Sequence, residues 1–453
     1  MSNEKIDTEA GNAVDLLQDL IARARRAGAD AADAVLFEGV SLSHARRLGK
    51  TEKLERSEGQ DLGLRVFIGR QQAIVSSTDR SPEALAELVE RAVAMARTVP
   101  EDPFCGIADP AEIARQWPVL DMLDPGEPSA EILIERARAA EEAALAVTGV
   151  TNSEGAEAGW ARSSVALAAS NGFAGAYSGS SHGVSASVIG GSGTGMERDY
   201  DFASAIFAAD LRDPAEVGKS AGERAVKRLG AKKMPTCRCP VVFDPRVARS
   251  FISHLLGSIS GPAIARGTSF LKDRLGERIF PEAITIVDDP HRPRGLRSKP
   301  FDGEGIANHR RALVDKGVLT TWLLDLRSAR QLGLHTTGHA ARGTASPPGP
   351  AATNVWIEPG TVSAKELVAD IESGFYVTEM MGMGVNGVTG DYSRGAAGFW
   401  IDKGEIAFPV SEMTVAGNLK DIFARLQAAD DLEFKAGADS PTLRVDDLTV
   451  AGA

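Results

Sequence analysis

Residues 390–419 constrain the fold more than any other part of the sequence, because they predict two adjacent strands joined by a tight turn. The runs 398–401 and 405–410 are short and rich in apolar residues, as strands are. Lys403 and Gly404 lie between them and are typical of a turn. The C-terminal part of the chain is therefore expected to contain a sheet.

The N-terminal half alternates helical and strand patterns that suit a sheet covered by helices. In residues 62–68 every second residue is apolar, which is typical of a half-buried strand. Asn171 and Gly172 separate two further strand-like runs and form a strong hairpin signal. Residues 100–128 lack periodicity and are expected to form a long connection. The predicted helices are 14–24, 81–95, 129–147 and 213–229, and the predicted strands are 62–68, 73–76, 160–170, 173–180, 184–189 and 200–209.

A polar linker at 232–238 precedes a strand-rich remainder, so we expect two domains, 1–231 and 232–453. The predicted fold class is α+β, with an N-terminal helix-covered antiparallel sheet followed by a strand-rich C-terminal domain. In the second domain the sequence predicts a strand at 240–244 and helices at 245–259, 363–372 and 418–428.

Composition and charge narrow the classes of function. The 453 residues carry a formal net charge of −12, which disfavours nucleic-acid binding because phosphate contacts need clustered Lys and Arg. Three cysteines are too few for a disulfide framework and suit a reducing compartment. The first residues are polar and acidic, and no run approaches the ~18 apolar residues of a membrane span. We therefore expect a cytoplasmic protein that binds neither nucleic acid nor a membrane.

Two motif matches do not carry the chemistry that their patterns suggest. Residues 382–387 fit GxGxxG, but another loop follows them, where a dinucleotide site needs a helix N-terminus. Residues 179–183 fit GxSxG, yet the residues after them alternate like a strand and do not open the helix of a nucleophile elbow. We predict a bent loop at the first match and a simple turn at the second.

His335 and His339 are the one histidine pair with the i, i+4 spacing of metal ligands on a helix. The residues between them, Thr336, Thr337 and Gly338, form a poor helix, and the sequence offers no obvious third ligand. The pattern favours a structural or cleft role for these histidines and leaves a metal role open.

Several blocks of the sequence occur in an order typical of one enzyme family. They are residues 240–245 (PVVFDP), 301–305 (FDGEG), 324–330 (LDLRSAR), 337–343 (TGHAARG), 390–419 and 441–452. These blocks resemble the TldD/TldE metallopeptidases, also called the PmbA or modulator-of-DNA-gyrase family, and the likeness extends over most of residues 60–453. Within that family the chain resembles the TldE (PmbA) branch.

The resemblance implies a departure from the zinc-binding TldD branch, in which a helix carries HExxxH and a cysteine near the C-terminus completes the site. The matching positions here hold Ile252, Ser253 and Gly257, none of which binds zinc or accepts a proton. The last cysteine is Cys239 and the last histidine is His339, so no soft ligand follows. We therefore expect no metal ligand and no catalytic residue in this chain.

By resemblance, the chain is expected to be the TldE-type subunit of a heteromeric metallopeptidase that cleaves unfolded or modified peptides, with zinc on a TldD-type partner. It would shape the peptide cleft and be inactive alone. The candidate cleft residues are His339, Asp391 and Arg394, the last as a ligand for a peptide carboxylate. Asp391 and Arg394, expected in a glycine-rich loop, could equally pair with each other. Two alternatives stay open: a stand-alone homodimeric metallopeptidase that uses His335 and His339, and a non-enzymatic peptide-binding regulatory protein.

Overall fold

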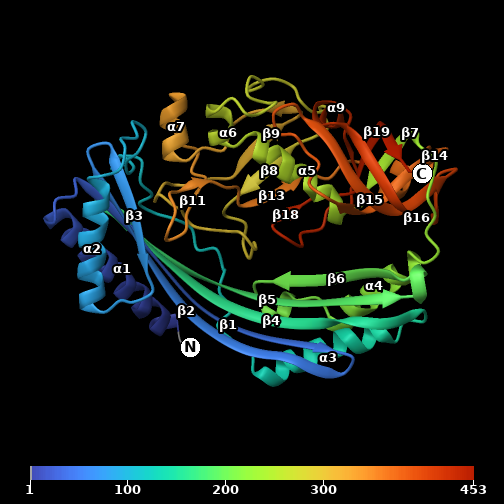
Figure 1. The fold of residues 1–453 in the computed structure, drawn as a ribbon, viewed down its shortest axis with the longest axis horizontal. Helices are drawn as coiled ribbons and strands as arrows, with labels where there is room; N and C mark the ends of the chain where they lie inside the picture. Colours follow the sequence, from blue (N-terminus) through green and yellow to red (C-terminus); the bar gives the residue numbers. More distant parts are fainter. Residues whose placement is uncertain (1–2, 453) are drawn as a thin grey trace.

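The protein has two parts, a long curved sheet and a C-terminal half that lies over the concave side of that sheet (Figure 1). The structure is a computed structural model and describes residues 3–452, with side chains from residue 10 onward. The sheet is antiparallel, in the order β3-β2-β1-β4-β5-β6. Its strands are β1 (Ala31–Arg47), β2 (Lys50–Ile68), β3 (Gln71–Ser77), β4 (Val150–Ala169), β5 (Ala174–Gly190) and β6 (Glu197–Ala205).

Several of these strands are longer than the sequence predicts. The alternating pattern starts at Leu62, whereas β2 begins at Lys50. The pattern does not show the first part of the strand, because residues 51–59 are exposed and have no apolar period. Strand β1, which pairs with β2 and β4 on its two sides, was not predicted from the sequence. Pairing across the sheet therefore extends strands that local sequence does not reveal.

The hairpin between β4 and β5 is confirmed, with Gly172 at φ +95°. The prediction of two separate strands after it, 173–180 and 184–189, is wrong, because β5 runs without a break to Gly190. Its residues 179–183 stay in the ladder with β4, so the GxSxG match forms a strand and not the predicted turn.

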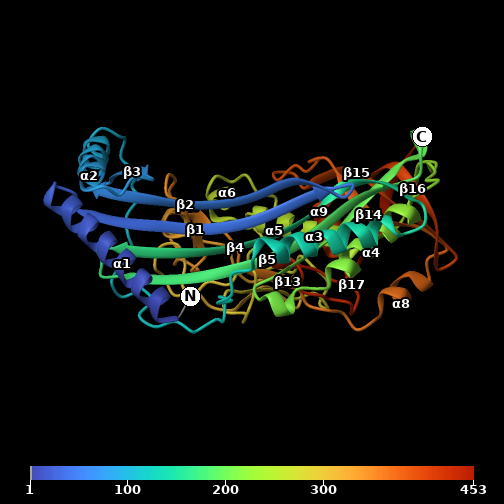
Figure 2. The same ribbon diagram turned by 90° about the horizontal axis from the view of Figure 1, so that it is seen from below.

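Helices cover the convex face of the sheet at both ends (Figure 2). The predicted helix starts at 81 and 213 are confirmed, and both residues are N-caps: Ser81 Oγ accepts the Ala84 N–H and Asp213 Oδ1 accepts the Ala215 N–H. Gly218 allows two helices to cross closely, since a Cβ there would lie 1.8 Å from the Ala140 carbonyl oxygen. The helices are α1 (Asn3–Arg26), α2 (Pro82–Ala96), α3 (Ala130–Leu145) and α4 (Pro214–Lys227).

The C-terminal half is built from two larger sheets and a short two-stranded one, in the orders β16-β15-β14-β7-β19-β17, β10-β9-β8-β13-β18 and β11-β12. The strands are β7 (Cys237–Phe243), β8 (Ile286–Asp289), β9 (Arg311–Asp315), β10 (Val318–Leu319), β11 (Ala340–Ala341), β12 (Gly349–Pro350), β13 (Asn354–Ile357), β14 (Ser373–Met381), β15 (Asp391–Asp402), β16 (Glu405–Asn418), β17 (Gln427–Ala428), β18 (Ala438–Asp439) and β19 (Leu443–Ala451). The helices are α5 (Pro245–Ser258), α6 (Gly261–Ala265), α7 (Leu326–Leu332), α8 (Ala364–Ala369) and α9 (Leu419–Ala424).

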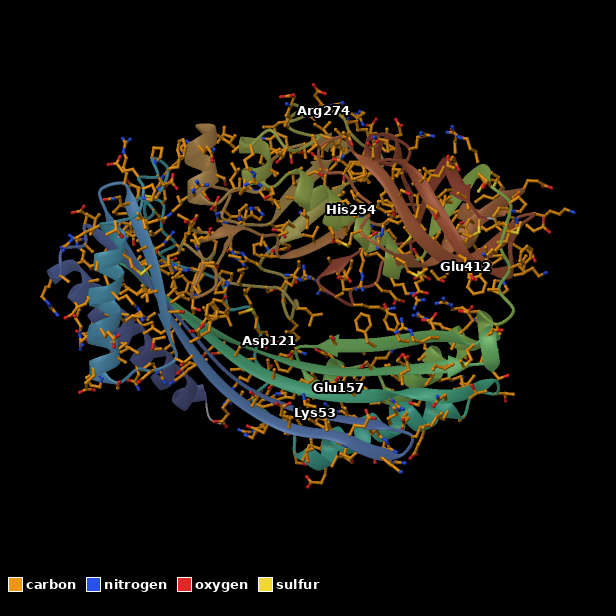
Figure 3. The ribbon with its side chains drawn as sticks, viewed as in Figure 1. Lys53, Asp121, Glu157, His254, Arg274 and Glu412 are labelled. Carbon is orange, nitrogen blue, oxygen red and sulfur yellow. The ribbon has the colours of Figure 1, made fainter. Side chains whose placement is uncertain are left out.

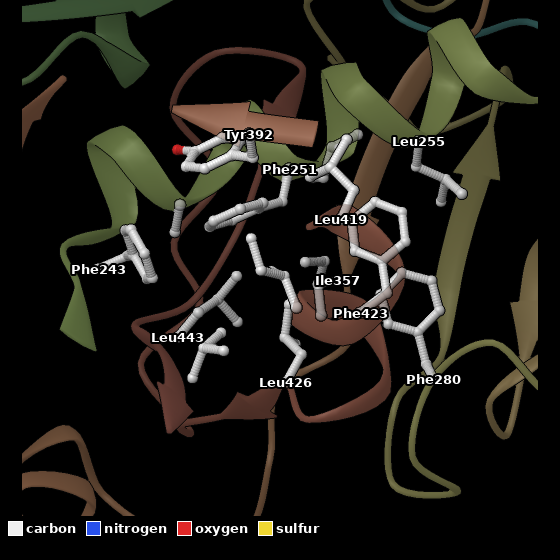
Figure 4. Packing of buried hydrophobic residues seen from close by; sticks show 14 of the residues in the cluster. Phe243, Phe251, Leu255, Phe280, Ile357, Tyr392, Leu419, Phe423, Leu426 and Leu443 are labelled. Atoms are coloured by element: carbon white, nitrogen blue, oxygen red, sulfur yellow. The ribbon is translucent and has the colours of Figure 1, made fainter. Parts of the chain in front are cut away.

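One core holds these sheets together, and α5 lies within it (Figure 4). Phe251 of α5 packs edge-on against Phe243 of β7, with ring centroids 4.8 Å apart, and stacks on Tyr392 of β15 at 5.9 Å. Phe423 of α9 stacks on Phe280 at 4.6 Å. Burial of these rings fixes α5 against the sheet, which leaves its opposite face free for function.

The α+β fold class is confirmed, and the turn at Lys403 and Gly404 is too, with both residues at positive φ. The expected loop at 390–397 is wrong: Asp391 and Arg394 are paired residues of β15, opposite Asn418 and Val415. All six strands of the first sheet precede residue 231, and the strands of the other sheets follow it. The division into two domains at that position stays a prediction. Across residues 3–452, no helix is long and apolar enough to cross a membrane.

Candidate functional site

A cavity of about 580 Å³ lies where the edge strand β6 meets the C-terminal half. Residues 198–200 of β6 form one wall, and residues 246–253 of α5 form another. Residues 378–380 of β14 and Arg394 of β15 close it. The cavity therefore joins both parts of the chain, the position in which a ligand would contact each of them.

A larger concavity of about 880 Å³ lies beside α1 on the convex face. Charged side chains that line it are paired with one another, such as Arg80 with Glu38 at 2.9 Å and Arg56 with Glu58 at 2.9 Å. It lies on the face of the sheet opposite α5, so the smaller cavity is the better candidate for the functional site.

The amphipathic pattern of α5 directs one of its faces into the cavity. Asp244 caps the helix by accepting the Arg246 N–H at 3.0 Å, and Pro245 occupies the first turn. Arg246, Arg249 and Ser253 recur at helical spacing and line the cavity. The opposite face is buried in the core and comprises Val247, Ala248, Phe251, Ile252, Leu255 and Ser258.

A β-bulge in β14 shapes the cavity wall. Val377 and Glu379 pair with successive residues of β15, so Thr378 between them has no partner in the ladder. Such bulges often redirect a side chain at a functional site. Gly398 lies opposite, where a Cβ would be 2.0 Å from the Tyr376 carbonyl oxygen and 3.0 Å from the Thr378 nitrogen. The bulge therefore requires glycine at position 398.

An ion-pair network ties the two parts of the chain together beside the cavity. Arg246 donates to both carboxylate oxygens of Asp199, at 2.6 and 2.9 Å, and to the Thr378 carbonyl at 2.7 Å. Arg228 lies 2.5 Å from Glu379 and 3.5 Å from Asp199. Burial opposes ionisation of Asp199, but the hydrogen bonds and charge of Arg246 outweigh it and lower the pKa of the carboxyl.

His254 lies on α5 next to Ser253, in the middle of the C-terminal half in the view of Figure 3. Its ring is 5.8 Å from the Tyr392 ring, and its Nε2 is buried without a hydrogen-bond partner among the described residues. Burial and then the charge of Arg394 lower the pKa of His254 to about 4. The imidazole is therefore neutral at pH 7 and adds no charge beside the cavity.

The three positions that the resemblance predicts to match HExxxH have different environments. Ile252 is fully buried in the core and Ser253 is exposed in the cavity. Gly257 is exposed, and nothing lies within 4 Å of the place that a Cβ would take there. An alkyl side chain, a hydroxyl and a hydrogen do not form a zinc site. Among the side chains of residues 10–452, no group of three or more His, Cys, Asp or Glu has an arrangement that could hold a metal ion.

The other predicted site residues do not converge. Arg394 lines the cavity, whereas Asp391 is exposed and hydrogen-bonds Thr389 and Asn418. His339 is 3% exposed, with Nε2 3.0 Å from Asp288 and Nδ1 2.8 Å from Thr337. His335 lies in a loop and is exposed. Of the three cleft candidates, only Arg394 lines the cavity. Asp391 does not form a salt bridge with Arg394.

Sequence patterns did not indicate Asp199, Arg228 and Arg246, which join the two parts of the chain. Asp199 lies in a strand predicted to begin only at residue 200, and Arg246 lies two residues after the helix cap Asp244. The excess of arginine on one face of α5, at positions 246 and 249, was the one local signal that could have indicated a charged site.

Three family models match successive parts of the chain. The model of PmbA/TldA metallopeptidase domain 1 matches residues 32–96, that of the central domain matches 123–229, and that of the C-terminal domain matches 236–452. The matches cover both walls of the cavity, because β6 lies in the central-domain match and α5 in the C-terminal one.

Individual proteins are similar over nearly the whole chain. Metalloprotease PmbA of Escherichia coli O157:H7 is 37% identical over 426 residues, which are 93% of this chain and 92% of that protein. A proposed modulator of DNA gyrase from Bacteroides thetaiotaomicron is 27% identical, with a TM-score of 0.90 over 97% of this chain and 98% of that chain. TldE from Thermococcus kodakarensis is 20% identical and shares the fold, with a TM-score of 0.86 over 96% of this chain and 100% of that chain.

Proposed function

Because the chain belongs to the PmbA/TldD metallopeptidase family, we propose that it is the TldE (PmbA)-type subunit of a heteromeric peptidase. A TldD-type partner would hold the zinc ion and cleave the peptide bond. This chain would bind part of an unfolded or modified peptide and complete the cleft. The natural site of action would be the cytoplasm.

The observation that carries this proposal is the chemistry of α5. At the positions of the family motif the helix presents Ser253 to the cavity and buries Ile252, while Gly257 has no side chain. Zinc hydrolysis needs nitrogen, sulfur or carboxylate ligands and a base for the attacking water. A helix that supplies neither but still borders a cavity suits substrate binding better than catalysis.

The groups that remain can hold a peptide. Arg394 and Arg249 offer charged hydrogen-bond donors, and Ser253 offers a hydroxyl. Beside them β6 is the last strand of its sheet, and an edge strand can add an extended peptide through main-chain hydrogen bonds. When zinc is bound by the partner, it would activate water, and this chain would fix the register of the peptide relative to it.

Cleavage of an unstructured peptide by the purified chain, with and without a TldD-type subunit of the same organism, tests the proposal. Mass spectrometry should detect fragments only from the mixture. Replacing the glutamate of the partner's HExxxH motif by glutamine should abolish them. Cleavage by this chain alone would favour the stand-alone peptidase, and binding without cleavage by the mixture would favour a regulatory protein.

A further inference from the structure

The cavity is strongly basic, although the chain as a whole carries a net charge of −12. Six arginines line it against two carboxylates, those of Asp199 and Glu379. A concave site of one sign concentrates field lines and attracts ligands of the opposite charge. The excess of positive charge therefore points to an anionic ligand.

Three of the arginines are already committed to carboxylates of the protein. Arg246 pairs with Asp199, Arg228 pairs with Glu379, and Arg198 lies 3.5 Å from Glu154. The other three are Arg249, Arg297 and Arg394, and none of them has a carboxylate of residues 10–452 within 4 Å. These three guanidinium groups are the ones available to a ligand.

Contacts with the protein restrict the positions of two of these arginines. Arg394 donates its Nε–H to the Gly382 carbonyl at 3.0 Å. The Arg249 guanidinium lies 5.8 Å from the centre of the Phe202 ring on β6. A side chain that is already restrained loses less conformational entropy when it binds a ligand.

The cavity also contains hydroxyl groups without partners. Ser250 Oγ on α5 and Thr378 Oγ1 in the β14 bulge are buried, and neither has a hydrogen-bond partner among the described residues. Buried polar atoms are nearly always satisfied in folded proteins, and exceptions frequently mark functional sites. Both hydroxyls can donate to an anion that the arginines attract.

We propose that this cavity binds the free C-terminal carboxylate of a peptide, with Arg394, Arg297 and Arg249 as its positive ligands. This inference rests on the proposed function, since it names the part of the peptide that this chain would hold. Apolar atoms of Tyr200 and Met380 in the same cavity suit the last side chain of the peptide. A nucleic acid would need a basic surface that follows many phosphates, which a single cavity does not provide.

The test compares a dansyl-labelled tripeptide, Gly-Ala-Leu, as the free acid and as the C-terminal amide. Fluorescence anisotropy with the full chain gives the two dissociation constants. A carboxylate held by arginines should make the acid bind at least about tenfold more tightly than the amide. Equal binding of acid and amide would overturn the proposal. A C-terminal amide with glutamate in place of leucine carries its only carboxylate on a side chain. If it binds as tightly as the free acid, the assignment of the site to the C-terminal carboxylate is overturned.

Variants locate the binding to the cavity. Arg394→Gln should weaken binding of the free acid about tenfold, and Arg394→Lys should weaken it less, because a lysine keeps the charge but loses the two-pronged donor. Arg297→Gln serves as a second variant if Arg394→Gln does not fold, as judged by circular dichroism. The control is Arg274→Gln, at an exposed ion pair away from the cavity (Figure 3). Wild-type binding in both cavity variants would overturn the proposal, as would displacement of the peptide by inorganic phosphate at equal concentration.

These outcomes are separable from failure of the proposed function. If the mixture with a TldD-type subunit cleaves a long peptide while acid and amide bind equally, the carboxylate site is refuted and the subunit role stands. If the mixture does not cleave, the subunit role fails, and preferential binding of the acid by this chain still identifies the cavity as a carboxylate site.

Discussion

Arg246 on α5 and Asp199 on β6 form a bidentate ion pair across the junction of the two parts of the chain. The Asp199 side chain is 3% exposed and the Arg246 side chain 14%. The same helix that binds Asp199 through its first turn presents Ser253 to the cavity about two turns further along the same face. The pair therefore fixes the distance between the sheet and α5, and with it the width of the site.

Asp199→Asn should destabilise the protein strongly, because it leaves Arg246 and Arg228 facing a neutral amide in a buried position. Loss of one partner of a buried pair typically costs about 3–5 kcal/mol. Urea unfolding followed by circular dichroism measures the loss. The control is Arg238→Gln, at an exposed pair with Asp447, which should cost about 1 kcal/mol or less. Equal effects of the two substitutions would contradict the role of Asp199.

His254 should make stability depend on pH. Its pKa is about 4 in the folded protein and near 6.5 in the unfolded chain, so the unfolded chain takes up a proton first as pH falls. Its contribution to stability is present above about pH 6.5 and is lost as pH falls towards 4. Unfolding free energies at pH 7.5, 6 and 5 should therefore fall less steeply for His254→Gln than for the wild type. His335→Gln, at an exposed site, should follow the wild-type profile, and parallel profiles for all three proteins would refute the prediction.

Gly398→Ala should distort the bulge that carries Thr378. The new methyl group would meet the Tyr376 carbonyl at 2.0 Å, and overpacking of this kind typically costs about 1–3 kcal/mol. Gly257→Ala is the matched control: nothing lies within 4 Å of its Cβ, and alanine favours a helix by up to about 1 kcal/mol. Melting temperatures should thus shift in opposite directions. A lower melting temperature in both variants would contradict the finding that a Cβ at Gly257 has open space around it.

Ile252 and Ser253 are neighbours in sequence but should respond differently to alanine. Ile252→Ala removes a fully buried side chain from the core and should cost about 2–5 kcal/mol. Ser253→Ala changes an exposed side chain in the cavity and should alter stability by less than about 0.5 kcal/mol. Chemical denaturation of both variants tests the orientation of α5, and a large loss for Ser253→Ala would contradict it.

Local chemistry explains what could be predicted from the sequence. Ser81 and Asp213 bond to backbone N–H groups two or three residues away, so their helix caps follow from adjacent residues alone. The turns at Gly172 and Gly404 use positive φ, which glycine permits. The strand at 391–397 was missed because its glycines and polar residues resemble a loop, whereas pairing with β14 and β16 on both sides makes it a strand.

The positions of the candidate site residues likewise depend on contacts between residues that are far apart in the sequence. Arg394 was predicted from its place in a block that resembles the family, but its position in the cavity depends on β14 and α5. Asp199 and Arg246 belong to different parts of the chain and meet only after both have folded. The burial of His339 against Asp288 likewise depends on residues far away in sequence. Such contacts are set by tertiary packing, which local patterns do not encode.

The most direct test of the central claim is the amount of zinc per chain, measured by elemental analysis of untagged protein purified without a partner. The account predicts less than about a tenth of an equivalent, because the motif positions of α5 supply no zinc ligand. A value close to one equivalent would contradict it, and His335 and His339 would then be the first residues to replace.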